Sequence, residues 1–166
     1  MKKTIVATVV AGVALLGVAR PATAMPNGAV TVKVINTTTS GQFPGRATVT
    51  GAINTSCQDG PPVVTFGPAG SFHVDDRLVC REGELLVSAD GTGTVQVDPT
   101  TCVGRFPQGG TFQFTGGTGE FAGATGGGTW TGNALLVFRR TAEGCLLNQQ
   151  PLVVVLRVTL TGTIAT

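Results

Sequence analysis

The chain has 166 residues, of which 25 are glycine and only 12% are charged, a composition that favours short strands and tight turns over helices. Three of its eleven basic residues, Lys2, Lys3 and Arg20, lie within the first 24 positions. The remaining 142 residues therefore carry eight basic and nine acidic side chains. This balance predicts no basic surface and excludes nucleic acid as a partner.

The N-terminal segment has the pattern of a removable export signal. Two lysines are followed by an uncharged apolar run at residues 4–19, and the segment ends in Ala22-Thr23-Ala24. The small residues suit cleavage between Ala24 and Met25. A run of about 16 residues is shorter than the roughly 20 that span a bilayer as a helix. We therefore predict a signal peptide at 1–24 and one secreted domain at 25–166, extracellular or periplasmic, of bacterial type and without a membrane span.

Five segments of the secreted part alternate between two faces with period two, as half-buried antiparallel strands do. They lie at about 30–35, 47–53, 111–115, 130–138 and 154–164. In the fourth, Trp130, Ala134 and Phe138 share a face. No segment repeats its apolar residues with the helical period of 3.6.

Turn residues separate the strands. Phe43-Pro44-Gly45 and Asp59-Gly60-Pro61-Pro62 interrupt the pattern, and Asp90-Gly91 is a strong hairpin signal. We count eight or nine strands, which predicts an all-β fold, an antiparallel barrel of about eight strands, with a β-sandwich as the alternative. Recurrent Thr-Gly pairs, as in Thr50-Gly51 and Thr161-Gly162, suit the bends of a barrel or follow from composition alone.

All four cysteines, Cys57, Cys80, Cys102 and Cys145, follow the predicted signal peptide, and an even number in an exported chain predicts two disulfides. No two stand at the close spacing of a zinc site, so we expect no metal and no cofactor. Four cysteines allow three pairings, among which the sequence does not decide. We favour Cys57–Cys80 and Cys102–Cys145.

The most distinctive segment is Gly116-Gly117-Thr118-Gly119-Glu120-Phe121-Ala122-Gly123-Ala124-Thr125-Gly126. Its glycine spacing is one residue too long for a dinucleotide-binding loop, and no helix follows. A calcium-binding nonapeptide repeat needs Asp where Phe121 stands. Neither kind of site is therefore expected here.

The segment resembles the GGTG-x-F-x-x-A-x-G stretch of the dirigent and allene oxide cyclase barrel superfamily, over about residues 111–139. The resemblance implies an eight-stranded, calycin-like antiparallel barrel with an internal cavity. It also implies a tight connection at Gly116, Gly117, Gly119 and Gly123, with Phe121 packed inward. Positive φ at Gly116, Gly117 and Gly119 carries no penalty. Thr125 replaces the usual Arg and the chain has no Tyr, so no catalytic residue carries over.

Other candidate groups have structural explanations. His73, the only histidine, precedes Asp75 and Asp76 and suits either a metal or base role or a polar strand end. We interpret the acidic stretch Asp75–Asp90 as a solvated hairpin with local ion pairs, rather than as a carboxylate pair for glycoside hydrolysis. Asn36-Thr37-Thr38 and Asn54-Thr55-Ser56 match the glycosylation pattern.

An eight-stranded barrel is near the size at which the interior is either filled or holds one small ligand. If it holds one, we expect an apolar ligand among the following residues: Trp130, Phe112, Phe114, Phe138 and Arg139. The leading hypothesis is non-catalytic binding of that ligand. The alternatives are a structural or protein-binding module of the cell envelope, and a cyclase- or dirigent-like enzyme that guides a reactive intermediate. The enzyme would need an inward ionisable side chain.

Overall fold

The computed structural model describes residues 27–39 and 45–166. The predicted signal peptide, its cleavage site and the predicted turn at residues 43–44 lie outside this part of the chain. Among the described residues, no helix is long and apolar enough to cross a lipid bilayer.

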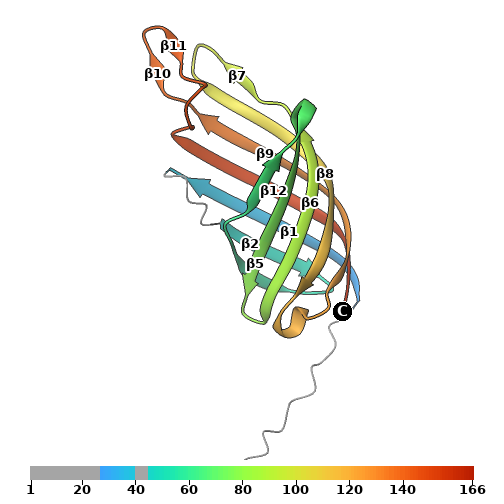
Figure 1. The fold of residues 1–166 in the computed structure, drawn as a ribbon. Helices are drawn as coiled ribbons and strands as arrows, with labels where there is room; N and C mark the ends of the chain where they lie inside the picture. The colour runs from blue at the N-terminus through green and yellow to red at the C-terminus, as the bar shows by residue number, and fades with distance from the viewer. Residues whose placement is uncertain (1–26, 40–44) are drawn as a thin grey trace, which may run out of the picture.

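The described chain is nearly all strand, with two short 3-10 turns (Figure 1). Its strands are β1 (Gly28–Thr38), β2 (Gly45–Gly51), β3 (Thr55–Asp59), β4 (Val63–Phe66), β5 (Ser71–Cys80), β6 (Gly83–Gly93), β7 (Gln96–Asp98), β8 (Val103–Gly117), β9 (Thr125–Val137), β10 (Arg140–Thr141), β11 (Gly144–Cys145) and β12 (Val153–Ala165). The 3-10 turns are η1 (Pro68–Gly70) and η2 (Gly119–Phe121).

Eight antiparallel strands form a closed barrel in the order β3-β2-β1-β12-β9-β8-β6-β5, and pairing of β5 with β3 completes the ring. The predicted all-β barrel is confirmed, and the alternative of a β-sandwich is wrong. In Figure 1, η2 lies in the orange turn at one end of the barrel, while β7, β10 and β11 project at the other end.

Strand β5 is shared between two partners along one edge. Its second half pairs with β3 and its first half pairs with β4. The interruption between β3 and β4 is the predicted breaker Gly60-Pro61-Pro62, where two prolines lack the N–H groups that a continuous ladder needs. Gly60 N–H still donates to the Arg77 carbonyl at 2.9 Å, which holds the interruption against β5.

The period-two pattern places one face of every barrel strand inside. Near η2 the interior is filled by fully or almost fully buried side chains: Val30, Val32, Val49, Leu78, Leu85, Phe112, Phe114, Phe121 and Ile164. Toward the other end, several inward side chains on β5, β8, β9 and β12 are only half-buried. The barrel is therefore closed by packing at one end and hollow toward the other.

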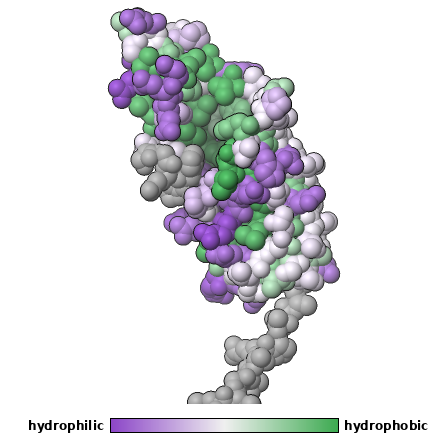
Figure 2. Space-filling view, viewed as in Figure 1, coloured by the Kyte–Doolittle hydropathy of each residue, from purple (hydrophilic) through white to green (hydrophobic). Residues whose placement is uncertain are grey.

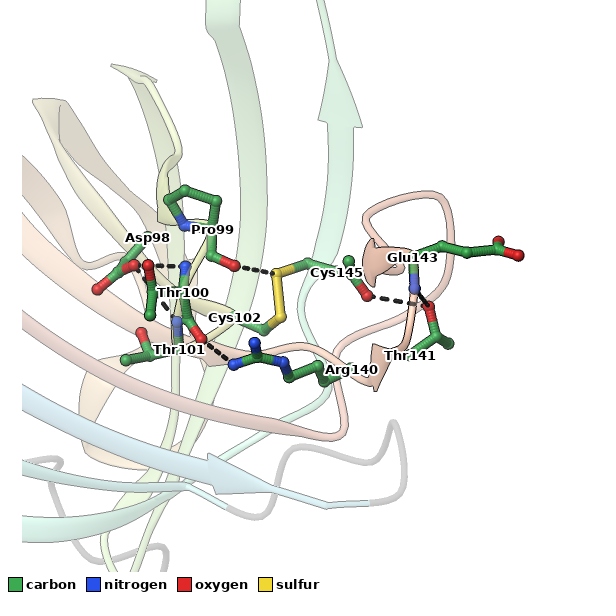
Figure 3. The surroundings of a disulfide bond; sticks show 10 residues. Asp98, Pro99, Thr100, Thr101, Cys102, Arg140, Thr141, Glu143 and Cys145 are labelled. Carbon is green, nitrogen blue, oxygen red and sulfur yellow. Dashed lines mark hydrogen bonds between the residues drawn. A yellow bond between two sulfur atoms is a disulfide. The ribbon is translucent and has the colours of Figure 1, made fainter.

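Two disulfides form with the pairing favoured from the sequence. Cys57–Cys80 joins directly opposed residues of β3 and β5, at the pairing that closes the barrel. Cys102–Cys145 ties the β10–β11 hairpin to the turn between β7 and β8 (Figure 3). Asp98 stabilises that turn, because its Oδ1 accepts from the N–H groups of Thr100 at 2.7 Å and Thr101 at 3.3 Å.

The glycine-rich segment forms the expected tight connection, from β8 through η2 to β9. Gly116, Gly119 and Gly123 have positive φ, whereas Gly117 does not. A Cβ on Gly117 would lie 2.7 Å from the Phe121 Cβ, so this glycine provides room for close approach instead. Phe121 is fully buried in the core, as the resemblance implied.

One turn prediction is wrong. Asp90-Gly91 does not form a hairpin, because β6 continues through it to Gly93 and pairs with β5 and β8 on either side. A Cβ on Gly91 would collide with the Trp130 ring. The glycine therefore serves packing across the barrel rather than a turn.

We predict that Phe121→Ser destabilises the protein by about 3–5 kcal/mol, the usual loss when a large buried aromatic is truncated. The cavity and the buried hydroxyl both contribute. Thermal unfolding followed by circular dichroism measures the loss. Phe66→Ser is the matched control, because the Phe66 side chain is 76% exposed. Equal melting temperatures for the Phe121 variant and the wild type would contradict the packing role.

Candidate functional site

The hollow half of the barrel contains a cavity of about 370 Å³. Figure 2 shows an apolar recess on the face in view. Sixteen apolar residues line it: Val34, Pro62, Val64, Phe66, Phe72, Val74, Val87, Ala89, Phe106, Trp130, Ala134, Leu136, Val154, Leu156, Val158 and Leu160. The remaining lining residues are Asn36, Asp59, Asp76 and Gln108. The volume and apolar lining are those of a small-molecule site.

Aromatic rings gather on one side of the cavity. The Phe72 ring is the centre of the group, with centroid distances of 6.4 Å to Phe66, 6.0 Å to Phe106 and 5.8 Å to Trp130. Trp130 is fixed by its indole N–H, which donates to the Asp90 carbonyl at 3.1 Å. These contacts make a preformed apolar wall.

Two carboxyl groups also line the cavity, from β3 and β5. Asp59 ends β3 and is 5% exposed, and Asp76 of β5 lies on the inward face between Val74 and Leu78. The two carboxyls interact through charge and a hydrogen bond. Asn36 Nδ2 donates to Asp59 Oδ2 at 3.0 Å, and the Arg77 N–H donates to Asp76 Oδ1 at 2.6 Å.

A glycine makes room for this arrangement. Gly45 is paired with Asn36 on one side and with Asp59 on the other. A Cβ at this position would lie 2.6 Å from Asp59 Oδ2 and 3.0 Å from Asn36 Nδ2. Any larger residue would push the two polar side chains apart, so the backbone of β2 is adapted to the pair.

Burial and the neighbouring charge of Asp76 raise the pKa of Asp59 to about 8, against the hydrogen bond from Asn36, which lowers it. Burial also raises the pKa of Asp76, while its hydrogen bonds with Asp59 and the Arg77 N–H oppose the rise. Two carboxylates held together in an apolar site do not both ionise readily. At neutral pH the pair therefore retains a proton that exposed carboxylates would have released.

Two oxygen atoms of this cluster have no hydrogen-bond partner within the described part of the chain. They are Asn36 Oδ1 and Asp59 Oδ1, both buried. Buried polar atoms are nearly always satisfied in native proteins, so unpartnered acceptors beside a cavity indicate where a bound group would donate.

The residues expected from the sequence to bind a ligand are not brought together. Trp130 lines the cavity. Phe112 and Phe114 pack edge-on with centroids 5.2 Å apart in the filled half. Phe138 and Arg139 follow the end of β9, and neither lines the cavity. Arg140 donates to the Thr100 carbonyl beside the second disulfide (Figure 3).

Sequence reasoning missed Asp59 and Asp76. Asp59 was assigned to a turn, and Asp76 to a solvated hairpin. The alternation of faces along a strand could have identified both residues as inward. Asp59 shares a face with Cys57, and Asp76 shares one with Phe72 and Leu78. The rest of the acidic stretch does form local ion pairs, Arg77–Glu84 at 3.6 Å and Arg81–Glu82 at 3.5 Å.

Burial also decides between the two glycosylation patterns. Asn36 is 2% exposed and points into the barrel, so the folded chain offers no site there. Asn54 is exposed, and its amide donates to the Gly51 carbonyl at 3.1 Å.

His73 lies on the outer surface rather than in the cavity. Its ring contacts Asp90 at 2.7 Å, and Asp75 and the Ser88 hydroxyl at 3.3 Å each. The hydrogen bond to Asp90, together with the charges of Asp75 and Asp90, raises the pKa of His73. No group of three or more potential metal ligands occurs among the described residues. The cluster is a polar strand surface.

No family model, curated protein or solved structure matches this chain.

The carboxyl pair predicts a pH-dependent stability. Between about pH 4 and pH 8, folded Asp59 holds a proton that the unfolded chain has released. The free energy of unfolding should therefore fall as the pH rises through this window, by up to roughly 1.4 kcal/mol per pH unit for one proton. We expect Asp59→Asn to reduce this slope, as measured by urea unfolding at pH 5, 6, 7 and 8.

Glu143→Gln is the control for that experiment, because Glu143 is an exposed carboxylate in the β10–β11 hairpin. It should keep the wild-type slope. His73 acts in the same direction from about pH 6.5 upward and stays unchanged in both variants. An Asp59→Asn slope identical to that of the wild type would show that the pair does not retain the proton.

Proposed function

We propose that this is an exported barrel protein that binds a small apolar ligand inside the barrel, without a catalytic step. The observation that carries the proposal is the apolar cavity of about 370 Å³, which a filled barrel would lack. Its aromatic wall is preformed, so binding a ligand there costs little ordering of side chains. An envelope module that binds other proteins would not require a hollow interior.

The resemblance of residues 111–139 to the dirigent and allene oxide cyclase superfamily supports the same proposal, because those barrels have an internal cavity. A second candidate is an enzyme that guides a reactive intermediate. Asp59 and Asp76 favour it, since they supply the inward ionisable groups that such an enzyme needs. A ligand recovered chemically changed after binding would favour this candidate, and one recovered unchanged would favour simple binding.

Export is supported by the N-terminal pattern and by the two disulfides, which suit an oxidising extracellular or periplasmic environment. Disulfides of this kind add about 2–4 kcal/mol to the stability of a small domain. The proposed mature protein is therefore residues 25–166, crosslinked twice.

Binding is testable with the single tryptophan as a reporter, since Trp130 lines the cavity. We expect saturable one-to-one binding of the neutral probe N-phenyl-1-naphthylamine, observed as energy transfer from Trp130. Ala134→Phe fills the cavity from β9 and should weaken binding by about ten-fold or more, equivalent to 1.4 kcal/mol.

The matched control is Leu135→Phe, which adds a ring at the next position of β9, where the side chain faces outward. It should bind the probe as the wild type does. Equal weakening by both variants, or no binding to the wild type, would contradict a ligand site inside the barrel.

Export is testable by intact-mass spectrometry of protein collected from the medium or periplasm of an expressing bacterium. We expect a mass that begins at Met25 and is lower by four hydrogens than that of the reduced chain. A mass that includes Lys2 and Lys3, or four free thiols, would overturn the export proposal.

A further inference from the structure

We propose that the ligand is a lipophilic amine, an apolar molecule whose single ammonium group docks against Asp59, Asp76 and Asn36. The inference rests on the proposed function, because it specifies the chemistry of the molecule that the cavity holds. It is carried by the geometry and charge of the cavity wall.

Three of the four polar residues that line the cavity form one cluster. Asp59, Asp76 and Asn36 are clustered by contact, and Gln108 is the one other polar lining residue. Along β5, the aromatic group at Phe72 and the carboxyl at Asp76 are four residues apart, or about 13 Å at the usual strand rise. A complementary ligand has one polar head and an apolar body that extends toward the rings.

The polar cluster offers acceptors rather than donors. The Asn36 amide donates to Asp59 Oδ2 at 3.0 Å, and the two carboxyl groups hydrogen-bond to each other, which uses the retained proton within the pair. Asn36 Oδ1 is left without a donor among the described residues, and Asn36 is more than nine-tenths buried. The head of the ligand must therefore donate hydrogen bonds, as an ammonium or a hydroxyl does.

Charge selects the ammonium. No Lys, Arg or His is among the described residues that line the cavity, so no protein cation faces the two carboxyls there. The nearest arginine in sequence, Arg77, is exposed on the outer face of β5 and pairs with Glu84 at 3.6 Å. A negative charge in an apolar cavity attracts a cation much more strongly than it would in water. A fatty acid would be repelled.

The contribution of the head group to affinity can be measured with three ligands that have the same chain length and differ only in that group: decylamine, decan-1-ol and decanoic acid. Each competes with N-phenyl-1-naphthylamine for wild-type protein at pH 7. We expect decylamine to bind about ten-fold or more tightly than decan-1-ol, the effect of one charge-assisted hydrogen bond, and decanoic acid to bind most weakly. Equal binding of amine and alcohol, or tighter binding of the acid, would overturn the amine inference.

The variant Asp59→Asn/Asp76→Asn removes both carboxyls and keeps the size of the side chains. It should lose the preference for decylamine and still bind decan-1-ol and the probe. Asp76→Asn alone provides the same test with a smaller risk to folding, and should reduce the preference. Glu143→Gln removes an exposed carboxylate that does not line the cavity and should keep the preference. A preference that survives in the double variant would overturn the inference.

The outcomes also separate this inference from the proposed function. Binding of the probe and the alcohol without a preference for the amine supports a ligand site but overturns its proposed chemistry. Failure of the probe and of all three decyl compounds to bind the wild type overturns both.

Discussion

The pairing of β3 with β5, crosslinked by Cys57–Cys80, is the constraint on which the rest of the structure depends. It joins the two ends of the sheet and converts it into a barrel. A closed sheet has an inside, and every inward side chain must then be packed, paired or left facing a cavity. Since β3 is only five residues long, the closing ladder is short, and the disulfide at its Cys57–Cys80 end holds it together.

The same edge places the carboxyl pair. Asp59 is the last residue of the closing strand, and Asp76 lies two residues before its partner Leu78 on β5. Burial of two ionised carboxylates would cost several kcal/mol, so the structure tolerates them by retaining a proton and by the hydrogen bond from Asn36. The same strand pairing therefore closes the barrel and brings the two carboxyl groups together. The proposed ligand site includes both of them.

The two halves of the interior differ because of side-chain size and register. Next to η2, Phe112, Phe114 and Phe121 fill the space between the strands, and the glycines of the connection let Phe121 reach the core. Farther along, Ala89, Ala134 and the valines of β12 are too small to meet across the barrel, which leaves the cavity. The aromatic group around Phe72 forms its wall because Gly91 makes room for Trp130.

The sequence by itself indicated the strands, because alternation of polar and apolar residues acts between near neighbours, and the even number of cysteines indicated two disulfides. It favoured a barrel over a sandwich, and the inward position of Phe121 was implied by the resemblance of the glycine-rich segment. Local patterns misassigned Asp90-Gly91 and Asp76, since a glycine or a carboxylate has the same local signature in a turn and in a strand. Only the tertiary structure brought Asn36, Asp59 and Asp76 together. Their meeting depends on the register of four strands and on closure of the barrel, and no segment of the sequence encodes either alone.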